Sequence, residues 1–267
     1  MTYSDIDRVR LPVQWLRERR GFITGATGWI GSWVCQALDS IGARYLYLAH
    51  TTEESTENFR FPEFCDYIIH LAPGRVGRVI ECAEKFDCPV LFTSSGAVYM
   101  QEPNEYAIAK QDNERAFLES VDVKIARCYT FAGAGIPIGR GYALGNFISA
   151  ALCGQPMHVW SNGLAIRSYM YMSDLVTWLF AILIDGAAGK AYDVGSEDEI
   201  SILELAHIIR VLFDRKPEII VDAGSNKEPL PYYIPDTREA QALGCETTID
   251  TEEAIIRTVR SMKEQYA

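Results

Sequence analysis

Short apolar runs alternate with amphipathic stretches along the first half of the chain. Residues 21–24 form an apolar run that leads into a glycine-rich turn, and a helical pattern follows from about Trp29 to Ser40. Gly42 ends this helix, and a second apolar run covers residues 45–50. Strand, helix and strand in this order predict a βαβ unit. Further strands are expected at 67–71, 89–93 and 123–129, with helices at about 75–86 and 106–119.

Strands that alternate with helices indicate a parallel sheet covered by helices on both faces. The pattern changes after about residue 133. From there we expect a loop-like stretch at 133–145, helices at 146–153, 174–183, 202–213 and 251–265, a strand at 191–195, and an irregular proline-containing segment at 226–235. We therefore predict an α/β fold, in which a doubly wound parallel sheet is interleaved with a smaller C-terminal lobe.

Composition and charge exclude several classes of protein. Of the 267 residues, 48% are hydrophobic and 23% are charged, which suits a globular chain with a sizeable core. Lys and Arg number 25 against 36 Asp and Glu, and the net charge of −11 argues against a nucleic-acid surface. The N-terminus has no signal-peptide pattern, and no run approaches the ~18 apolar residues of a membrane span. We expect a cytoplasmic protein without nucleic-acid or membrane partners.

The seven cysteines form no CxxC pair, and several lie inside apolar runs, which predicts reduced and mostly buried thiols. The four histidines form no cluster with other ligands at metal-binding spacing, so we expect no metal site. His70 ends an apolar run, where a structural or cofactor-lining role is favoured over a catalytic one.

The segment TGATGWIG places Gly25, Gly28 and Gly31 between the first predicted strand and helix. The first glycine permits a tight turn, the second lets the backbone approach a pyrophosphate, and the third allows the helix to pack closely on the strand. This context predicts a dinucleotide site. An acidic residue that would hold the adenosine ribose is missing at the end of the second strand, where His50 stands. No Arg stands there either, so this strand end leaves NAD and NADP both open and the cofactor is written NAD(P). Of the two, NAD is somewhat favoured.

Tyr106 and Lys110 are four positions apart and lie on one face of a predicted helix. A lysine ammonium beside a phenol, together with a nicotinamide ring, lowers the tyrosine pKa from about 10 toward neutrality. Such a tyrosine can serve as the acid/base of an alcohol–ketone interconversion. Ser95, at the end of a predicted strand, can donate a hydrogen bond to the same substrate oxygen.

These segments together resemble the extended short-chain dehydrogenase/reductase family, and within it the NAD-dependent epimerase/dehydratase branch that acts on nucleotide sugars. The resemblance extends from about Arg20 to Val259. It is carried by TGATGWIG, IIHLAP, TSSGAVY, YAIAK, ARCYTFAG, GLAIRSYMYMSDL, AYDVGSEDEISILELA and PDTREAQALG. The resemblance implies a Rossmann-type dinucleotide-binding domain at 1–133 plus about 169–197. A substrate-binding lobe is implied at about 134–168 plus 198–267.

The resemblance also implies roles for individual residues. The catalytic residues would be Ser95, Tyr106 and Lys110, with Tyr106 as the acid/base. The cofactor would contact Gly25, Thr27, Gly28, Trp29, Ile30, Gly31, His50, Leu71, Ala72, Pro73, Thr93, Tyr106, Lys110 and Tyr129. The substrate would contact Ser95, Gly96, Thr130, Asn146, Arg167 and Asp236. Arg167 would be a charge-assisted donor to phosphate, the alternative being an ion pair with Asp174.

Several reactions fit this set of residues. Family members that eliminate water usually carry an Asp-Glu pair directly after the serine, whereas Gly96 and Ala97 stand here, which disfavours a 4,6-dehydratase. An epimerase acting at a sugar hydroxyl carbon, C4 by preference, ranks first. A 4-ketoreductase that uses NAD(P)H is the alternative, and a non-catalytic nucleotide sensor or scaffold ranks below both.

Two connections are short for the family. Tyr106 comes only 11 positions after Ser95, and the stretch from Thr51 to Tyr67 omits the usual extra strand on the adenine side. The family further implies a homodimer, formed through the helices at about 75–86 and 106–119.

Overall fold

The computed structural model describes residues 5–48, 59–74, 76–139, 142–160, 162–222 and 232–266. The chain divides into two compact units. The first unit consists of Met1–Tyr129, Ser173–Val194 and Asp236–Glu246, and the second of Thr130–Met172, Gly195–Pro235 and Thr247–Ala267. The segment Asp236–Glu246 thus packs with the first unit, whereas the sequence analysis placed it in the substrate-binding lobe.

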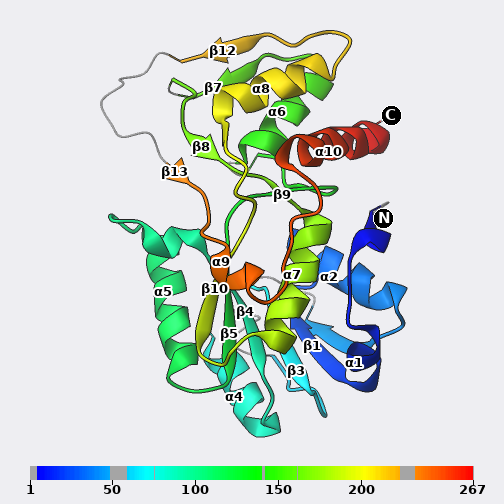
Figure 1. Cartoon of the computed structure of the whole chain (residues 1–267), viewed down its shortest axis with the longest axis vertical. Coiled ribbons are helices and arrows are strands. Elements are labelled where there is room, and N and C mark those ends of the chain that lie inside the picture. The colour runs from blue at the N-terminus through cyan, green and yellow to red at the C-terminus, as the bar shows by residue number, and fades with distance from the viewer. Residues whose placement is uncertain are drawn as a thin grey trace. The chain divides into compact units, whose positions relative to one another are not determined.

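The first unit is built on a six-stranded parallel sheet with the order β10-β5-β4-β3-β1-β2 (Figure 1). The predicted fold class is confirmed. Its strands are β1 (Arg20–Thr24), β2 (Arg44–Leu48), β3 (Tyr67–His70), β4 (Val90–Ser95), β5 (Val123–Cys128) and β10 (Lys190–Val194). Each of the strands expected from the apolar runs is present, with ends that differ by a few residues.

Helices connect these strands in the order that the sequence predicts. They are α2 (Trp29–Ser40), α4 (Gly77–Phe86), α5 (Glu105–Leu118) and α7 (Met172–Asp185), with the shorter η1 (Ile6–Arg8), α1 (Val13–Glu18), η2 (Gly96–Tyr99) and α9 (Arg238–Gln241). The chain runs from β1 to β2 in one direction across the sheet and from β3 to β5 in the other. Right-handed crossovers therefore place α2 on the face opposite α4 and α5.

The second unit contains short strands and three helices among its described residues. The helices are α6 (Ala143–Leu152), α8 (Ile202–Val211) and α10 (Thr251–Tyr266). The strands are β6 (Phe131–Ala132), β7 (Met157–Val159), β8 (Ile166–Arg167), β9 (Met170–Tyr171), β11 (Ile200–Ser201), β12 (Ile219–Val221) and β13 (Tyr232–Tyr233). They form the small sheets β11-β8-β13, β12-β7 and β6-β9. Ser201 and Glu204 begin α8 with a reciprocal capping box.

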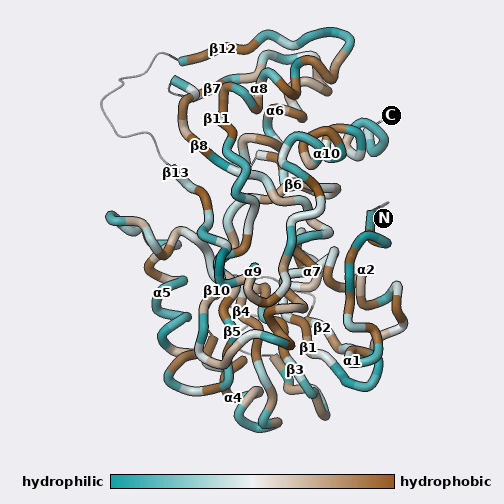
Figure 2. The backbone as a smooth tube through the Cα atoms, viewed as in Figure 1, coloured by the Kyte–Doolittle hydropathy of each residue, from teal (hydrophilic) through white to brown (hydrophobic). Residues whose placement is uncertain are grey.

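Burial follows the strands of the parallel sheet. The four residues of β3 and the six of β4 are all buried, as the helices on both faces require. Figure 2 shows the hydrophobic colouring concentrated along these strands. On the α4 and α5 face, Phe92 of β4 packs in one core cluster with Val79 and Phe117. Within the described ranges, no helix is long and apolar enough to cross a membrane.

Candidate active site

The glycine turn connects β1 to α2 with very little room for side chains. Gly25 has a positive φ of 74°, and a Cβ on it would lie 2.7 Å from the backbone nitrogen of Ala72. A Cβ on Gly31 would lie 2.1 Å from the carbonyl oxygen of Gly25. The turn therefore fits tightly between the start of α2 and the segment that follows β3.

The first turn of α2 presents backbone N–H groups beside this turn. Gly28 is the N-cap residue, and no side chain caps the helix there. Trp29, Ile30 and Gly31 form the first turn, and Thr27 is exposed just before it. The N–H groups of a helix's first turn and the positive end of its dipole attract an anion. The start of α2 can accept a phosphate group without any basic side chain.

The position of this turn in the sheet also suits a ligand. Strand β1 lies between β2 and β3, so the connections after β1 and β3 leave in opposite directions. In open parallel sheets, ligands bind in the crevice outside the carboxyl ends of the strands at such a point. Leu71, Ala72 and Pro73, which the sequence analysis assigned to the cofactor, directly follow β3 there. His50, assigned to the same site, lies outside the described residues.

His70 is fully buried at the end of β3, where it packs within the core at the carboxyl edge of the sheet. Its Nδ1 lies 2.6 Å from the Thr24 hydroxyl, and its ring stacks on Phe92 with a centroid separation of 5.7 Å. Burial, together with the smaller effect of the Lys110 charge, lowers the pKa of His70 to about 3. A histidine that remains neutral in the core fits the expected structural role.

Lys110 places a charge at the carboxyl end of β4. Its Nζ donates a hydrogen bond of 2.8 Å to the carbonyl oxygen of Thr93 and lies 5.9 Å from the centroid of the Tyr106 ring. Burial lowers the pKa of Lys110 to about 8, while Glu114 opposes that shift. The lysine is therefore mainly protonated at neutral pH. Tyr106 is 55% exposed, so its phenol can be reached from solvent.

Ser95 ends β4 and begins the short connection to α5. Its Oγ accepts a hydrogen bond of 3.2 Å from the Ala97 backbone and so caps η2. Asn104 caps α5 in the same way, and Gln111 ties α5 back to the Val98 carbonyl. One turn of 3-10 helix and a capped helix start are thus enough to span the 11 positions between Ser95 and Tyr106.

Gly96 packs against Tyr129, which follows β5. A Cβ on Gly96 would lie 2.5 Å from the tyrosine ring, so only glycine fits there without movement. The Tyr129 hydroxyl in turn donates a hydrogen bond of 3.1 Å to Asp193 at the end of β10. Gly96, Tyr129 and Thr93 therefore all lie at the carboxyl edge of the sheet, as their predicted roles require.

A polar network along this edge was missed by the sequence analysis. Glu114 of α5 accepts two hydrogen bonds from Arg127, at 3.0 and 2.7 Å, and Arg127 donates a third to the Tyr99 hydroxyl. Tyr99 donates to Asp193 over 3.1 Å. Burial raises the pKa of Asp193 even though both tyrosines donate to it. The only signal in the sequence was an acidic residue in the apolar run AYDVG.

Three of the predicted substrate residues belong to the second unit. Thr130 and Arg167 line one small cavity of about 150 Å³ together with Tyr142 and Tyr169. Arg167 also lies with its guanidinium 5.7 Å from the centroid of the Tyr233 ring. Asn146 accepts a hydrogen bond of 2.8 Å from the Gly139 backbone. The cavity therefore combines one cation with aromatic walls.

Asp236 belongs to the first unit. Its carboxylate accepts hydrogen bonds from the Arg238 side chain, which lowers the pKa of Asp236 to about 2. Its backbone N–H is bonded to Asp193. Both ends of this residue are thus engaged within the first unit. Across the described parts of the chain, no group of three or more His, Cys, Asp or Glu side chains is placed to hold a metal ion.

Comparison with known proteins finds one matching family model. Residues 75–195, which include Ser95, Tyr106 and Lys110, match the model of the NAD dependent epimerase/dehydratase family. The match covers 121 of the 267 residues. The resemblance drawn from the sequence motifs is confirmed.

Similar proteins are known by sequence and by structure. This chain is 30% identical over 161 residues to UDP-glucuronic acid decarboxylase 1 of Xenopus tropicalis, which is 60% of this chain and 36% of that protein. The chain thus spans about a third of the curated relatives that it matches. An epimerase from Methanothermobacter thermautotrophicus has a TM-score of 0.81 at 20% identity, covering 98% of this chain and 96% of that one. UDP-glucose 4-epimerase from Thermotoga maritima, solved with UDP-glucose, has a TM-score of 0.78 at 19% identity, covering 93% and 100%.

Proposed function

We propose that this protein binds NAD(P), with NAD favoured, and oxidises and re-reduces the C4 carbon of a nucleotide-diphosphate sugar, which makes it an epimerase. The observation that carries the proposal is the position of Lys110. Its ammonium is held by the Thr93 carbonyl beside the Tyr106 ring, at the same sheet edge as the glycine turn. This is the arrangement that an acid/base tyrosine requires.

The glycine turn fits the cofactor. Side chains are excluded at Gly25 and Gly31, and the first turn of α2 directs its N–H groups and the positive end of its dipole toward a pyrophosphate. The family is described as NAD dependent, which supports the same assignment. When bound, the dinucleotide supplies the acceptor and donor of the hydride. The protein's part is to hold it, to orient the sugar and to move the hydroxyl proton.

In the proposed reaction, Tyr106 removes the proton from the sugar hydroxyl while the hydride leaves the same carbon. The nearby Lys110 ammonium stabilises the phenolate, because opposite charges favour the ionised form. Ser95 holds the sugar oxygen, and Tyr106 returns the proton after the intermediate ketone has presented its other face. In the second unit, Arg167 is assigned to the diphosphate, to which it would donate charge-assisted hydrogen bonds.

A second candidate follows from the curated relatives, which are UDP-glucuronic acid decarboxylases. Oxidation at C4 of a sugar that carries a carboxylate on C5 gives a β-keto acid, which loses carbon dioxide readily. The first chemical step and its residues are the same as for the epimerase. The substrate therefore distinguishes the two candidates, because only a uronic acid sugar has the carboxylate to lose.

The test is product analysis with a small panel of substrates. Purified protein is incubated with NAD⁺ and, in separate reactions, UDP-glucose, UDP-galactose or UDP-glucuronic acid, and the products are separated and weighed. Interconversion of the first two supports the epimerase, and loss of carbon dioxide from the third supports the decarboxylase. Turnover must disappear in Tyr106→Phe. Cofactor binding without turnover on any of these or on 4-keto sugars would contradict the proposal and favour a nucleotide sensor.

The cofactor is identified separately from the protein as purified. Mass analysis of the released ligand distinguishes NAD from NADP by one phosphate. The same measurement shows any nucleotide sugar that remains bound and names its base. Recovery of NADP alone would overturn the preference for NAD.

We also propose a homodimer through α4 and α5, the family's usual dimer helices. On α5, Ile108 is 45% and Leu118 48% exposed. Sedimentation should show a dimer at micromolar concentration that Ile108→Arg weakens. A monomer across that range would contradict the assignment.

A further inference from the structure

Three buried cysteines lie together near the amino-terminal edge of the six-stranded sheet, which is the edge opposite the candidate active site. The Sγ atoms of Cys65 and Cys88 are 3.8 Å apart, and Cys65 also hydrogen-bonds to Cys82 of α4. All three belong to the core cluster between the sheet and its α4 and α5 face. Neither the glycine turn nor the proposed proton transfer uses any of them.

The two closest thiols lie in the connections that lead into neighbouring strands. Cys65 precedes β3 and Cys88 precedes β4, both outside regular helix and strand, whereas Cys82 lies in the middle of α4. A disulfide needs an S–S distance of about 2.05 Å, so the sulfur atoms of Cys65 and Cys88 must approach by a little under ~2 Å. Rotation about the two side chains with a small backbone shift can supply that movement.

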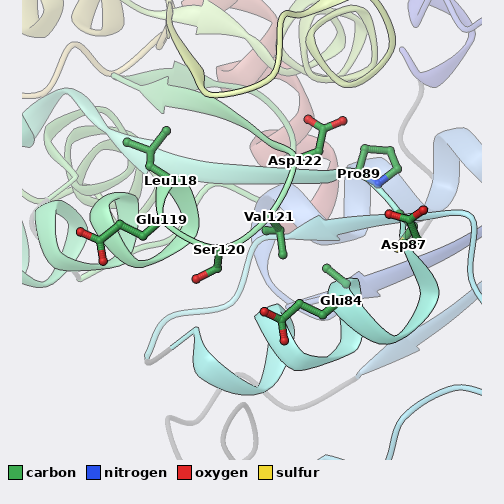
Figure 3. A pocket seen from close by; sticks show the side chains of 10 residues that line it. Glu84, Asp87, Pro89, Leu118, Glu119, Ser120, Val121 and Asp122 are labelled. Carbon is green, nitrogen blue, oxygen red and sulfur yellow. The ribbon is translucent and has the colours of Figure 1, made fainter.

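A cavity gives small molecules a route to this pair. It has a volume of about 580 Å³ and is lined by Cys88 together with the end of α4 and the segment that follows α5. Its walls carry Glu84 and Asp87 from one side and Glu119 and Asp122 from the other (Figure 3). The carboxyl ends of both helices point there as well, adding negative dipole. The cavity therefore admits neutral or cationic reagents and repels anions.

The charges around Cys82 add a second property. A hydrogen bond from Cys65 lowers the pKa of Cys82, and the cations Lys85 and Arg78 lower it further. Cys82 is therefore the competing nucleophile of the cluster, and the test must distinguish a bond to Cys82 from the proposed bond. The donor to Cys82 is Cys65, which also lies against Cys88.

We propose that Cys65 and Cys88 are a redox-active pair, which an uncharged peroxide entering this cavity converts to a reversible disulfide. The Cys88 sulfur attacks one oxygen of hydrogen peroxide, the O–O bond breaks, and water leaves with the thiol proton, which gives a sulfenic acid. The Cys65 sulfur then displaces the hydroxyl from Cys88, forming the S–S bond, and the second water carries away the Cys65 proton. The two sulfur atoms lose two electrons in all, and the peroxide gains them. This proposal is independent of the proposed enzymatic activity.

Trypsin separates the three thiols, because its cleavage sites place Cys65, Cys82 and Cys88 in peptides 61–75, 79–85 and 86–110. The protein is treated with hydrogen peroxide, its remaining thiols are blocked, and it is digested without reductant. The background is Cys153→Ser, which removes an exposed cysteine of the second unit that could link two molecules. We expect peptides 61–75 and 86–110 joined, with a loss of about 2 Da that dithiothreitol reverses. A bond from Cys65 to Cys82 instead, or no bond at all, would overturn the proposal.

Variants then test which cysteines form the disulfide and whether reagents reach them through the cavity. Cys82→Ala should still form the cross-link, whereas Cys88→Ser should not, and circular dichroism verifies that each variant is folded. Tetrathionate is a dianion. In the native chain, it should react with the Cys65–Cys88 pair at least ~3-fold more slowly than with Cys153. The double variant Glu84→Gln, Glu119→Gln should remove most of that difference and leave the peroxide rate unchanged. If tetrathionate reacts equally fast at both places, the cavity is not the route.

Discussion

Two places at opposite edges of the parallel sheet differ in local charge although they are built on the same set of strands. At the carboxyl edge, the start of α2 and the Lys110 ammonium are positive. At the amino edge, carboxylates and the ends of α4 and α5 surround the cavity beside Cys88. In a parallel α/β sheet every connecting helix begins near one edge and ends near the other, so the helix dipoles add up. The difference teaches that local charge, and not the net charge of −11, decides where an anionic ligand binds.

The largest effect is expected when the Lys110 cation at the carboxyl edge is removed. Lys110→Met should lower turnover about 10²- to 10⁴-fold, because Tyr106 loses the charge that stabilises its phenolate. The matched control, Lys85→Met, removes a lysine of α4 and should leave turnover unchanged. Activity is measured on whichever UDP-sugar the wild-type protein converts. Equal losses in both variants would show that the effect reflects overall charge.

The same variant has a predictable effect on stability. The folded pKa of Lys110, about 8, lies below the value of an unfolded lysine. The unfolded chain therefore binds more protons between these two values, and wild-type stability should rise as the pH increases through that window. Below pH 8 the buried charge of Lys110 costs free energy in the folded state. The free energy of unfolding of Lys110→Met should therefore be about 1–2 kcal/mol higher than that of the wild-type protein at pH 7. Denaturant unfolding at pH 7 and pH 10 measures both effects.

The next test concerns the tight fit of the glycine turn. Gly31→Ala should destabilise the fold by about 2–4 kcal/mol and weaken dinucleotide binding, since its Cβ would lie 2.1 Å from the Gly25 carbonyl oxygen. Gly77→Ala is the control, because nothing lies within 4 Å of the added methyl group at the start of α4. It should leave stability unchanged or raise it by up to about 0.5–1 kcal/mol. Calorimetry and cofactor titration give the two readouts.

A smaller effect is expected from the buried histidine. His70 has a folded pKa of about 3, below its unfolded value, so the unfolded chain takes up the proton first as the pH falls. Stability is therefore lost on acidification below about pH 6.5, by roughly 2 kcal/mol at pH 5. His70→Asn retains an acceptor for the Thr24 hydroxyl and should flatten this dependence. An unchanged slope in the variant would show that other groups govern acid unfolding.

Much of the carboxyl edge could be predicted from the sequence, because its chemistry depends on short motifs. The spacing of Gly25, Gly28 and Gly31 encodes a turn, and the four positions from Tyr106 to Lys110 place both side chains on one helix face. Both signals are local. The amino edge gave no such signal, since Cys65 and Cys88 are 23 positions apart and meet only because β3 and β4 are neighbours in the sheet.

The position of Asp236 could not be predicted for a related reason. Its motif comes late in the chain, among segments of the second unit, yet the residue bonds to Asp193 through its backbone and packs with the first unit. The network around Asp193 is equally non-local, because it joins α5, η2 and the ends of β5 and β10. Pairings across a sheet follow from strand order, which apolar runs alone do not specify.

The smallest test asks whether that network adds to the carboxyl edge. Tyr99→Phe removes the hydroxyl that accepts from Arg127 and donates to Asp193, and should cost about 1 kcal/mol of unfolding free energy. A double-mutant cycle with Asp193→Asn isolates the pair, since Tyr129 still donates to the amide oxygen. A coupling energy near zero would assign the stability of this edge to packing alone. A positive coupling that weakens in high salt would instead tie it to the charges of Arg127 and Asp193.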